Sequence, residues 1–310
     1  MYKKFFGLTV KPFTLIPDPR FLYLSAKHRK AFTALQYGLQ SHAGFTLITG
    51  EIGSGKTTLV RSLLEKIKDE CEIGLITNTH SAFGDLLTWI LAAFKIKSNA
   101  SNKAERFQSF VDFITEVSKS QRRVVLIVDE AQNMDIQTLE ELRLLSNINV
   151  NYEIMLQLIL VGQPELVDKL NRPELIQFSQ RISIEYHLTP LDFEETEQYI
   201  HHRLTVAGSE APIFQRSACA ALYYYSDGTP RLINNLADLA LVFAFASDHK
   251  EIDWKIIVDV IRERTTGGIK RFEDKVCLSS NISEQPEETK KLQQAINKET
   301  GVDIFKKKGR

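Results

Sequence analysis

GFTLITGEIGSGKTTLVRSLL, residues Gly44–Leu64, is the stretch that decides the fold. A short apolar run, Phe45–Thr49, leads into a glycine-containing turn, and a helical pattern follows the turn. The octet Gly50–Thr57, GEIGSGKT, matches G-x-x-x-x-G-K-[ST] and has the strand before it and the helix after it that a phosphate-binding loop requires. Average residue usage gives a chance match in a chain this long a probability of about one in a hundred. We therefore predict a phosphate-binding loop rather than an accidental turn.

Each part of this loop has an expected role in holding ATP and Mg²⁺. Glycines let backbone N–H groups face the phosphates, and the helix N-terminus adds its positive end. Lys56 is expected to reach the β- and γ-phosphates, and the Thr57 hydroxyl is expected to bind Mg²⁺. The predicted nucleotide-contacting residues are Gly50, Glu51, Ile52, Gly53, Ser54, Gly55, Lys56, Thr57 and Thr58.

VVLIVDEAQ, residues Val124–Gln132, supplies the second half of the predicted site. An apolar strand ends in Asp129, which is expected to hold Mg²⁺, and Glu130 follows as the candidate base for the attacking water. The carboxyl ends of parallel strands are where an α/β sheet places its ligand. Many strands end in an acidic turn, so Asp129 and Glu130 indicate a nucleotide site only in combination with the glycine-rich loop upstream.

Three further polar residues are candidates for the same chemistry. Gln163 ends the apolar run of LILVGQPEL, residues Leu158–Leu166, and faces the γ-phosphate if this strand lies between the two described above. A plain polar turn before a proline explains Gln163 equally well. Arg181 opens a strand-like run and Arg231 opens a helical one, and a solvated charge is the default interpretation for each arginine.

Short apolar runs alternate with helical patterns and predict an α/β fold with a five-stranded parallel sheet. The predicted strands are Phe45–Thr49, Ile73–Thr77, Val124–Val128, Leu156–Val161 and Ile182–Leu188. After Pro190 only helices are predicted, over residues 192–207, 213–225, 229–247 and 252–265. The predicted organisation is an N-terminal arm and helix (1–43), an α/β nucleotide-binding core (44–190), an all-helical lid (191–266) and a charged, mostly disordered tail (267–310) with a short helix near 288–298.

Composition excludes several classes of protein. Lys plus Arg and Asp plus Glu number 39 each, which disfavours a nucleic-acid binder. Cys71, Cys219 and Cys277 form no CxxC pair, and the His201-His202 pair has no third ligand close in sequence, so no zinc site is expected. The N-terminus carries no export signal, and no apolar run reaches the roughly 18–20 residues of a membrane span. We expect a cytoplasmic protein without a transmembrane segment.

The chain resembles the AAA+ ATPases, and within them the general secretion pathway protein A (ExeA-like) type. The resemblance covers residues 1 to about 265. It rests on the stretches FFGLTVKPFTLIPDPRFLYLS, GFTLITGEIGSGKTTLVRSLL, VVLIVDEAQNM, LILVGQPEL, SQRISIEYHLTPL and SDGTPRLINNLADLAL. It implies the sensor-1 place for Gln163 and the sensor-2 place for Arg231. It also implies an arginine finger reaching a neighbouring subunit, for which Arg181 is the first candidate and Arg172 the second.

The resemblance also implies ATP hydrolysis by a homo-oligomer that assembles an envelope machine for secretion, pili or polysaccharide export. Longer members continue into a membrane span and a peptidoglycan-binding domain, whereas this chain resembles the short cytoplasmic type found with MSHA pili or exosortase. An inner-membrane or envelope partner is therefore expected. Two alternatives stay open: a DNA-associated ATPase of the transposition-regulator type, and a nucleotide-dependent scaffold with little turnover.

Overall fold

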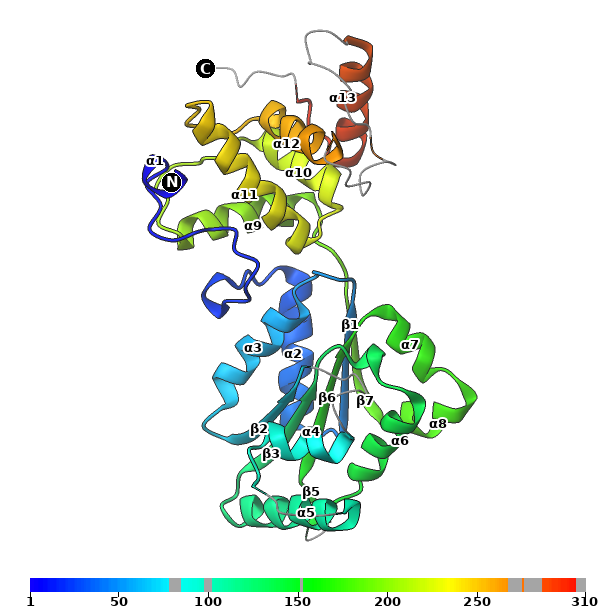
Figure 1. Ribbon diagram of the computed structural model, residues 1–310. Helices are drawn as coiled ribbons and strands as arrows, with labels where there is room; N and C mark the ends of the chain where they lie inside the picture. Colours follow the sequence, from blue (N-terminus) through cyan, green and yellow to red (C-terminus); the bar gives the residue numbers. More distant parts are fainter. Residues whose placement is uncertain (78–84, 98–101, 151–152, 267–274, 276–285, 305–310) are drawn as a thin grey trace. The chain divides into compact units, whose positions relative to one another are not determined.

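The structure is a computed structural model that describes residues 1–77, 85–97, 102–150, 153–266, 275 and 286–304 (Figure 1). The chain forms two compact units, each with its own hydrophobic core. An α/β unit comprises residues 26–52 and 56–189, and a helical unit comprises residues 1–25, 53–55 and 190–310. Each unit is described by itself below.

The α/β unit is built on a parallel sheet with strand order β2-β3-β6-β1-β7. Its strands are β1 (Phe45–Gly50), β2 (Cys71–Ile76), β3 (Arg123–Val128), β6 (Leu156–Gly162) and β7 (Ile182–Leu188). The predicted five-stranded parallel sheet is confirmed, and β6 lies between β3 and β1 as the interpretation of Gln163 required. A small antiparallel hairpin, β4 (Asn149–Val150) with β5 (Glu153–Ile154), was not predicted.

Helices cover both faces of this sheet, which explains why the central strands are apolar at nearly every position. β3 is buried from Val124 to Val128, and β6 is buried along its whole length. The helical segments are α2 (Ala26–Gln40), α3 (Lys56–Ile67), α4 (Leu86–Ala93), α5 (Lys103–Lys119), η3 (Ala131–Asn133), α6 (Ile136–Leu145), α7 (Pro164–Leu170), η4 (Pro173–Leu175) and α8 (Ile176–Ser179). α2 and α3 pack together against β1, and α2 also covers β7, while α4 to α8 contribute to the core on the opposite face.

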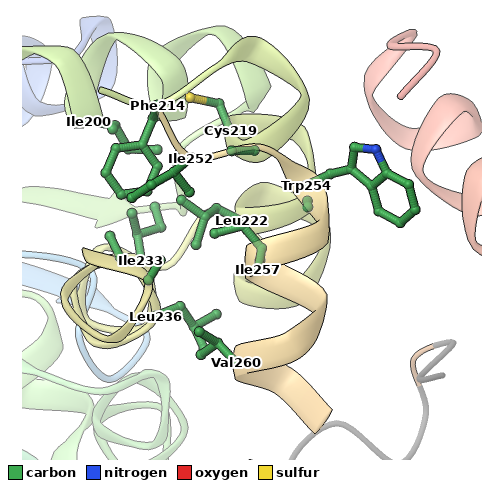
Figure 2. Packing of buried hydrophobic residues seen from close by; sticks show 14 of the residues in the cluster. Ile200, Phe214, Cys219, Leu222, Ile233, Leu236, Ile252, Trp254, Ile257 and Val260 are labelled. Atoms are coloured by element: carbon green, nitrogen blue, oxygen red, sulfur yellow. The ribbon is translucent and has the colours of Figure 1, made fainter. Parts of the chain in front are cut away.

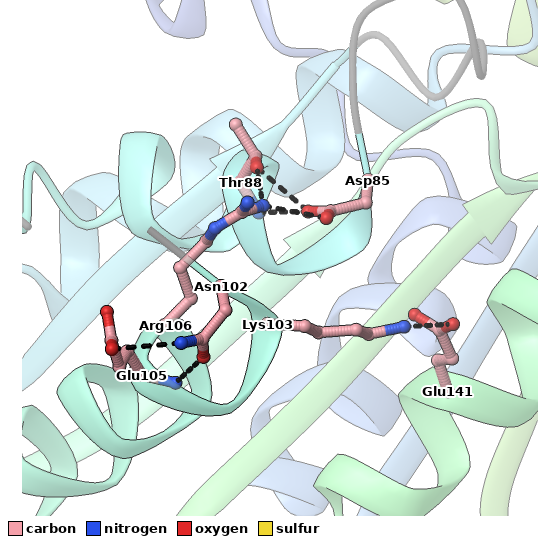
Figure 3. A network of polar contacts seen from close by, with 7 residues as sticks. All are labelled: Asp85, Thr88, Asn102, Lys103, Glu105, Arg106 and Glu141. Atoms are coloured by element: carbon pink, nitrogen blue, oxygen red, sulfur yellow. Dashed lines mark hydrogen bonds and ion pairs between the residues drawn. The ribbon is translucent and has the colours of Figure 1, made fainter. Parts of the chain in front are cut away.

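Polar contacts between helix ends hold α4, α5 and α6 together (Figure 3). Asp85 caps the N-terminus of α4 and pairs with Arg106 of α5 at 2.7 Å. Asn102 caps α5, and Lys103 in the first turn of that helix pairs with Glu141 of α6 at 2.6 Å. Burial raises the pKa of Asp85, but hydrogen bonds from Thr88 and the charge of Arg106 outweigh it and lower the pKa. The two pairs join the start of α5 to α4 and to α6, and because they are partly exposed each adds little to stability.

The helical unit follows the predicted run of helices closely. Its segments are α1 (Tyr2–Phe5), η1 (Pro19–Phe21), α9 (Phe193–Val206), α10 (Arg216–Ser226), α11 (Pro230–Ala246), α12 (Trp254–Thr266) and α13 (Pro286–Thr300). Figure 2 shows how residues of α9 to α12 form one apolar core, with Leu222, Ile233 and Ile257 meeting at its centre. Among the described helices, none has the length together with the apolar composition that crossing a bilayer demands.

The N-terminal arm packs in the helical unit, and α2 packs in the α/β unit, so the structure divides residues 1–43 between the two. Arg203 of α9 is only 7% exposed, and its guanidinium Nε donates to the carbonyl of Pro12 at 2.5 Å. The same guanidinium lies 4.7 Å from the ring centroid of Phe21. Tyr2 donates a short hydrogen bond to Asp238 of α11. A buried arginine must satisfy its donors, and the carbonyls of the arm do so.

The charged C-terminal region contains an ordered helix, α13, that packs on α10. Leu292 and Ile296 lie one turn apart on α13 and are fully buried, as is Leu222 of α10. The predicted short helix near residues 288–298 is therefore present and longer than expected. Residues 267–274, 276–285 and 305–310, for which disorder was predicted, lie outside the described residues.

We predict that Asp192→Ala destabilises the helical unit by about 1 kcal/mol. The Asp192 carboxylate accepts the backbone N–H of Glu195 at 2.8 Å, and the Glu195 carboxylate accepts the backbone N–H of Asp192 at 3.2 Å, which is a complete capping box at the start of α9. The measurement is urea unfolding followed by circular dichroism. Asp192→Asn keeps an acceptor oxygen and serves as the control; equal losses in both variants would contradict the capping argument.

Candidate functional site

The phosphate-binding loop is positioned by β1 on one side and α3 on the other. Gly53 and Gly55 have φ values of +82° and +103°, a region that side chains with a Cβ rarely adopt, so the bend of the loop requires glycine at both places. The Lys56 ammonium donates to the carbonyls of Gly50 at 2.7 Å and Glu51 at 2.9 Å. The lysine is thereby held at the mouth of the loop, at the carboxyl end of β1.

Burial shapes the electrostatics of this loop. Lys56 is 6% exposed and Asp129 is 7% exposed. Burial lowers the pKa of Lys56, against the opposing effect of the Glu130 and Asp129 charges. Burial also raises the pKa of Asp129, against the hydrogen bond from Thr57. Both charged forms are partly deprived of water, so a ligand that brings complementary charges would relieve both.

Thr57 and Asp129 bring two hard oxygen ligands to one point. The Thr57 hydroxyl donates to the Asp129 carboxylate at 2.9 Å, and the other Asp129 oxygen accepts the backbone N–H of Glu130 at 3.0 Å. Hydroxyl and carboxylate oxygens beside a phosphate-binding loop are the donor set that Mg²⁺ takes in proteins. The residues present therefore fit a hard divalent cation held jointly with a phosphate.

Glu130 is held by two amide side chains at the carboxyl end of the sheet. Gln132 donates to one Glu130 carboxylate oxygen at 2.6 Å, and Gln163 donates to the same oxygen at 3.1 Å. Gln132 also accepts the backbone N–H of Gln163 at 3.1 Å. Glu130 itself has φ +54°, the left-handed conformation, which turns its side chain out of the line of β3. The predicted pair of Glu130 and Gln163 is thus brought together, with Gln132 as the link.

Two features behind this network keep it in place. A Cβ added at Gly162 would lie 2.7 Å from Leu166 and 3.1 Å from the Gln132 side-chain oxygen, so only glycine lets Gln132 approach Gln163 so closely. Lys169 of α7 donates to the carbonyl of Gln132 at 2.7 Å and to that of Met134 at 2.5 Å. The loop after β3 is therefore anchored from α7.

Sequence reasoning missed Gln132 and Lys169. The glutamine stands in the same DEAQ stretch that identified the two acids, so the motif itself was the available signal. Lys169 gave no signal, because a lysine on a helix is ordinarily a solvated charge.

The three candidate arginines lie in different settings. Arg181, at the start of β7, donates to Ser146 at 2.9 Å and Asn147 at 2.6 Å, at the C-terminal end of α6. Arg172 is exposed and precedes η4. Arg231 lies in the first turn of α11, in the helical unit. Their finger and sensor roles stay predictions.

The remaining predicted contacts are local to the loop. Ile52 is 55% exposed and Glu51 is exposed, whereas Ser54 is buried. Thr58 lies half-buried in the first turn of α3, next to Thr57. Contacts of these residues with a nucleotide stay predictions.

Comparison with known proteins places this site in context. The family described as "AAA domain" matches residues 39–170, which contain the loop, both acids and Gln163. General secretion pathway protein A of Aeromonas hydrophila is 42% identical over 252 residues, which are 81% of this chain and 46% of that protein. The chain therefore spans about half the length of the curated relative that it matches.

Solved structures show the same fold at low sequence identity. The ORC2 protein of Aeropyrum pernix (TM-score 0.61, 15% identity) covers 93% of this chain, with 89% of its own length matched. The alignment with Cdc6p of Pyrobaculum aerophilum (TM-score 0.61, 15% identity) covers 81% of this chain and 71% of Cdc6p. The alignment with a Walker-type ATPase of Pyrococcus abyssi (TM-score 0.53, 18% identity) covers 85% of this chain and 79% of that ATPase. The fold is thus the α/β AAA fold, and an AAA domain implies nucleotide binding.

We predict that Lys169→Met lowers the free energy of unfolding by about 1–3 kcal/mol, because two carbonyls of the anchored loop lose their donor. Urea unfolding measures the change. Lys119→Met is the matched control, since Lys119 is 68% exposed and, among the described residues, pairs only with Glu116 of its own helix; a change within about 0.5 kcal/mol is expected there. Similar values for the two variants would show that Lys169 is another solvated charge.

Proposed function

The chain is an AAA domain protein homologous to General secretion pathway protein A, and from that premise we propose that it is a Mg²⁺-dependent ATPase. The observation that carries the proposal is the continuous set of contacts at the carboxyl ends of β1, β3 and β6. Thr57 contacts Asp129, and Gln163 contacts Glu130, the next residue in the loop after β3. A structural turn would not need a buried lysine and a buried aspartate at the same edge of the sheet.

The residues divide the reaction among them. Backbone N–H groups of Gly50–Thr57 and the Lys56 ammonium bind the β- and γ-phosphates of ATP. Thr57 and Asp129 would hold Mg²⁺, which supplies positive charge against the phosphate oxygens. Glu130 accepts a proton from the attacking water, and Gln163 orients that water or the γ-phosphate from the neighbouring strand.

Full activity in this proposal needs more than one copy of the chain. Arg181, or Arg172 in its place, reaches the nucleotide of a neighbouring subunit, and Arg231 reads the γ-phosphate from the helical unit. An arginine finger contributes roughly 10³–10⁵-fold to the rate of hydrolysis. A monomer should therefore turn over ATP slowly, and a homo-oligomer should turn it over faster.

We propose a role in secretion, pilus assembly or polysaccharide export, in the cytoplasm and at the inner membrane through an envelope partner. The support is the 42% identity to General secretion pathway protein A. A DNA-linked role has less support, because the chain carries no net charge and duplex binding draws on phosphate neutralisation. Steady-state turnover separates the ATPase from a nucleotide-binding scaffold.

The first test is ATP turnover per subunit across a wide range of protein concentration. We expect turnover to rise with concentration and to be lost in Lys56→Ala, Glu130→Gln and Arg181→Ala. ATP binding should survive in the last two variants, because neither residue is needed to hold the phosphates in this proposal.

Arg172→Ala is the matched control for the finger assignment. Loss of turnover in Arg172→Ala with normal turnover in Arg181→Ala would move the finger to Arg172. Flat, negligible turnover of the wild type at every concentration would overturn the autonomous ATPase and favour the scaffold.

A second test separates the metal from the nucleotide. Asp129→Asn keeps an oxygen that accepts from Thr57 but removes the negative charge, so Mg²⁺ should no longer strengthen nucleotide binding, while binding in a chelator should be unchanged. Titration of a fluorescent ADP analogue with and without Mg²⁺ measures both. An undiminished Mg²⁺ effect in the variant would show that Asp129 is not a metal ligand.

A further inference from the structure

Three side chains with metal-binding donor atoms meet in the helical unit, and none of them belongs to the residues assigned above. They are Glu197 and His201 of α9 and Cys219 of α10. Their ligand atoms all lie within 4.8 Å of one another. Within the part of the chain that the structure describes, no other group of His, Cys, Asp and Glu side chains meets this condition.

The fold brings the three together by ordinary helix geometry. Glu197 and His201 are four positions apart on α9 and so project from the same face of that helix, one turn from each other. α9 packs against α10, and Cys219 lies near the start of α10. No metal-binding spacing marks this group in the sequence, and no zinc site was expected, because the cysteine is contributed by the next helix.

Burial is graded across the group. Cys219 is fully buried, and Figure 2 shows its sulfur among the apolar side chains of Ile200, Phe214 and Ile252. Glu197 and His201 are half-buried. An ion held here would thus be anchored in the core by sulfur and remain accessible to water on its outer side.

The donor set matches the preferences of one class of metal. Zn²⁺ takes cysteine sulfur, histidine nitrogen and carboxylate oxygen, at bond lengths of about 2.0–2.3 Å. Tetrahedral coordination at these lengths places the sulfur, nitrogen and oxygen ligand atoms about 3.3–3.6 Å apart. Separations of up to 4.8 Å therefore need to close by up to about 1.5 Å, through side-chain rotation as the ion binds. The thiolate and the carboxylate together balance the charge of the ion.

The surroundings supply one competing charge. Arg216, one turn before Cys219, has its Nε 3.8 Å from a Glu197 oxygen. Its side chain is 54% exposed and also lies 3.9 Å from Glu194, so it has a second acid to pair with when Glu197 binds an ion. Burial, followed by the Glu197 charge, raises the pKa of the Cys219 thiol above its ordinary value. Binding of the metal ion forms the S–metal bond and releases the thiol proton to solvent.

We propose that Glu197, His201 and Cys219 bind a divalent metal ion of the zinc class that links α9 to α10, with water as the fourth ligand. This proposal does not depend on the nucleotide site. Its function would be to stabilise the helical unit, since an ion bound only by the folded chain raises stability.

The test is Co²⁺ titration of the full-length chain, reduced and freed of metal with a chelator. Cys277 lies outside the described residues, so all samples carry Cys277→Ser. We expect one Co²⁺ per chain, a thiolate-to-cobalt charge-transfer band in the near ultraviolet, and loss of that band when Zn²⁺ is added. Cys219→Ser should abolish the band.

His201→Ala and Glu197→Gln test the metal site even if replacing the buried Cys219 unfolds the helical unit. Each should weaken Co²⁺ binding by more than the roughly 10-fold that loss of an outer contact costs. Cys71→Ala, at the other described cysteine, and His249→Ala, at an exposed histidine, are the controls and should bind as the parent does.

Three outcomes would overturn the proposal: no charge-transfer band with stoichiometric Co²⁺, a band that survives Cys219→Ser, or binding that is equally weak in the parent, His201→Ala and His249→Ala. The last outcome means an adventitious ion only. Zn²⁺ should also raise the thermal unfolding midpoint of the parent but not of His201→Ala, a measurement that needs no ATPase activity.

Discussion

The parallel register of β3, β6 and β1 is the constraint on which the candidate site depends. Val128 is paired with Leu160, and Leu160 is paired with Leu47, so Asp129 and Glu130 follow β3 at the level of the last residues of β6 and β1. A slip of one residue in either pairing would turn every side chain of the moved strand to the opposite face. β3 is buried from Val124 onward and β6 along its whole length, so a slip would put side chains of the wrong size into close-packed positions on both faces. Packing of the core therefore sets the positions of Asp129, Glu130 and Gln163, although the core residues themselves do not contact a substrate.

At the candidate site, the cost of burying charged groups is opposed by the hydrogen bonds that those groups make. Burial disfavours the charged forms of Lys56 and Asp129, yet each keeps its partners: two loop carbonyls for the lysine, and Thr57 with the Glu130 backbone for the aspartate. A bound phosphate would bring negative charge to Lys56, and a divalent cation would bring positive charge to Asp129. Such a site is prepared for its ligand in advance, and little reorganisation is left for the moment of binding.

The sheet and most of the site were predictable because they rest on local patterns. VVLIV (residues 124–128) and LILV (residues 158–161) are continuous apolar runs, and GEIGSGKT combines a motif with the strand and helix that it needs. What escaped prediction depends on contacts between distant parts of the chain. Arg203 pairs with Pro12, and Cys219 meets His201, only after α9 and its neighbours have packed. The β4–β5 hairpin was missed for another reason, since strands of two residues leave no periodic pattern.

The two finger candidates begin from different states, and this difference bears on how an oligomer would use them. Arg181 already donates two hydrogen bonds within its own chain, to Ser146 and Asn147. Reaching a neighbour's nucleotide means exchanging these bonds for bonds to phosphate, in which both partners are charged. Because phosphate is charged and the present acceptors are neutral, the exchange favours phosphate. Arg172 is exposed and donates no side-chain hydrogen bond to the described residues, but it loses more side-chain freedom when it is fixed. Arg181 stays the first candidate for the finger and Arg172 the second, because the side chain of Arg181 is already ordered and loses less freedom on binding.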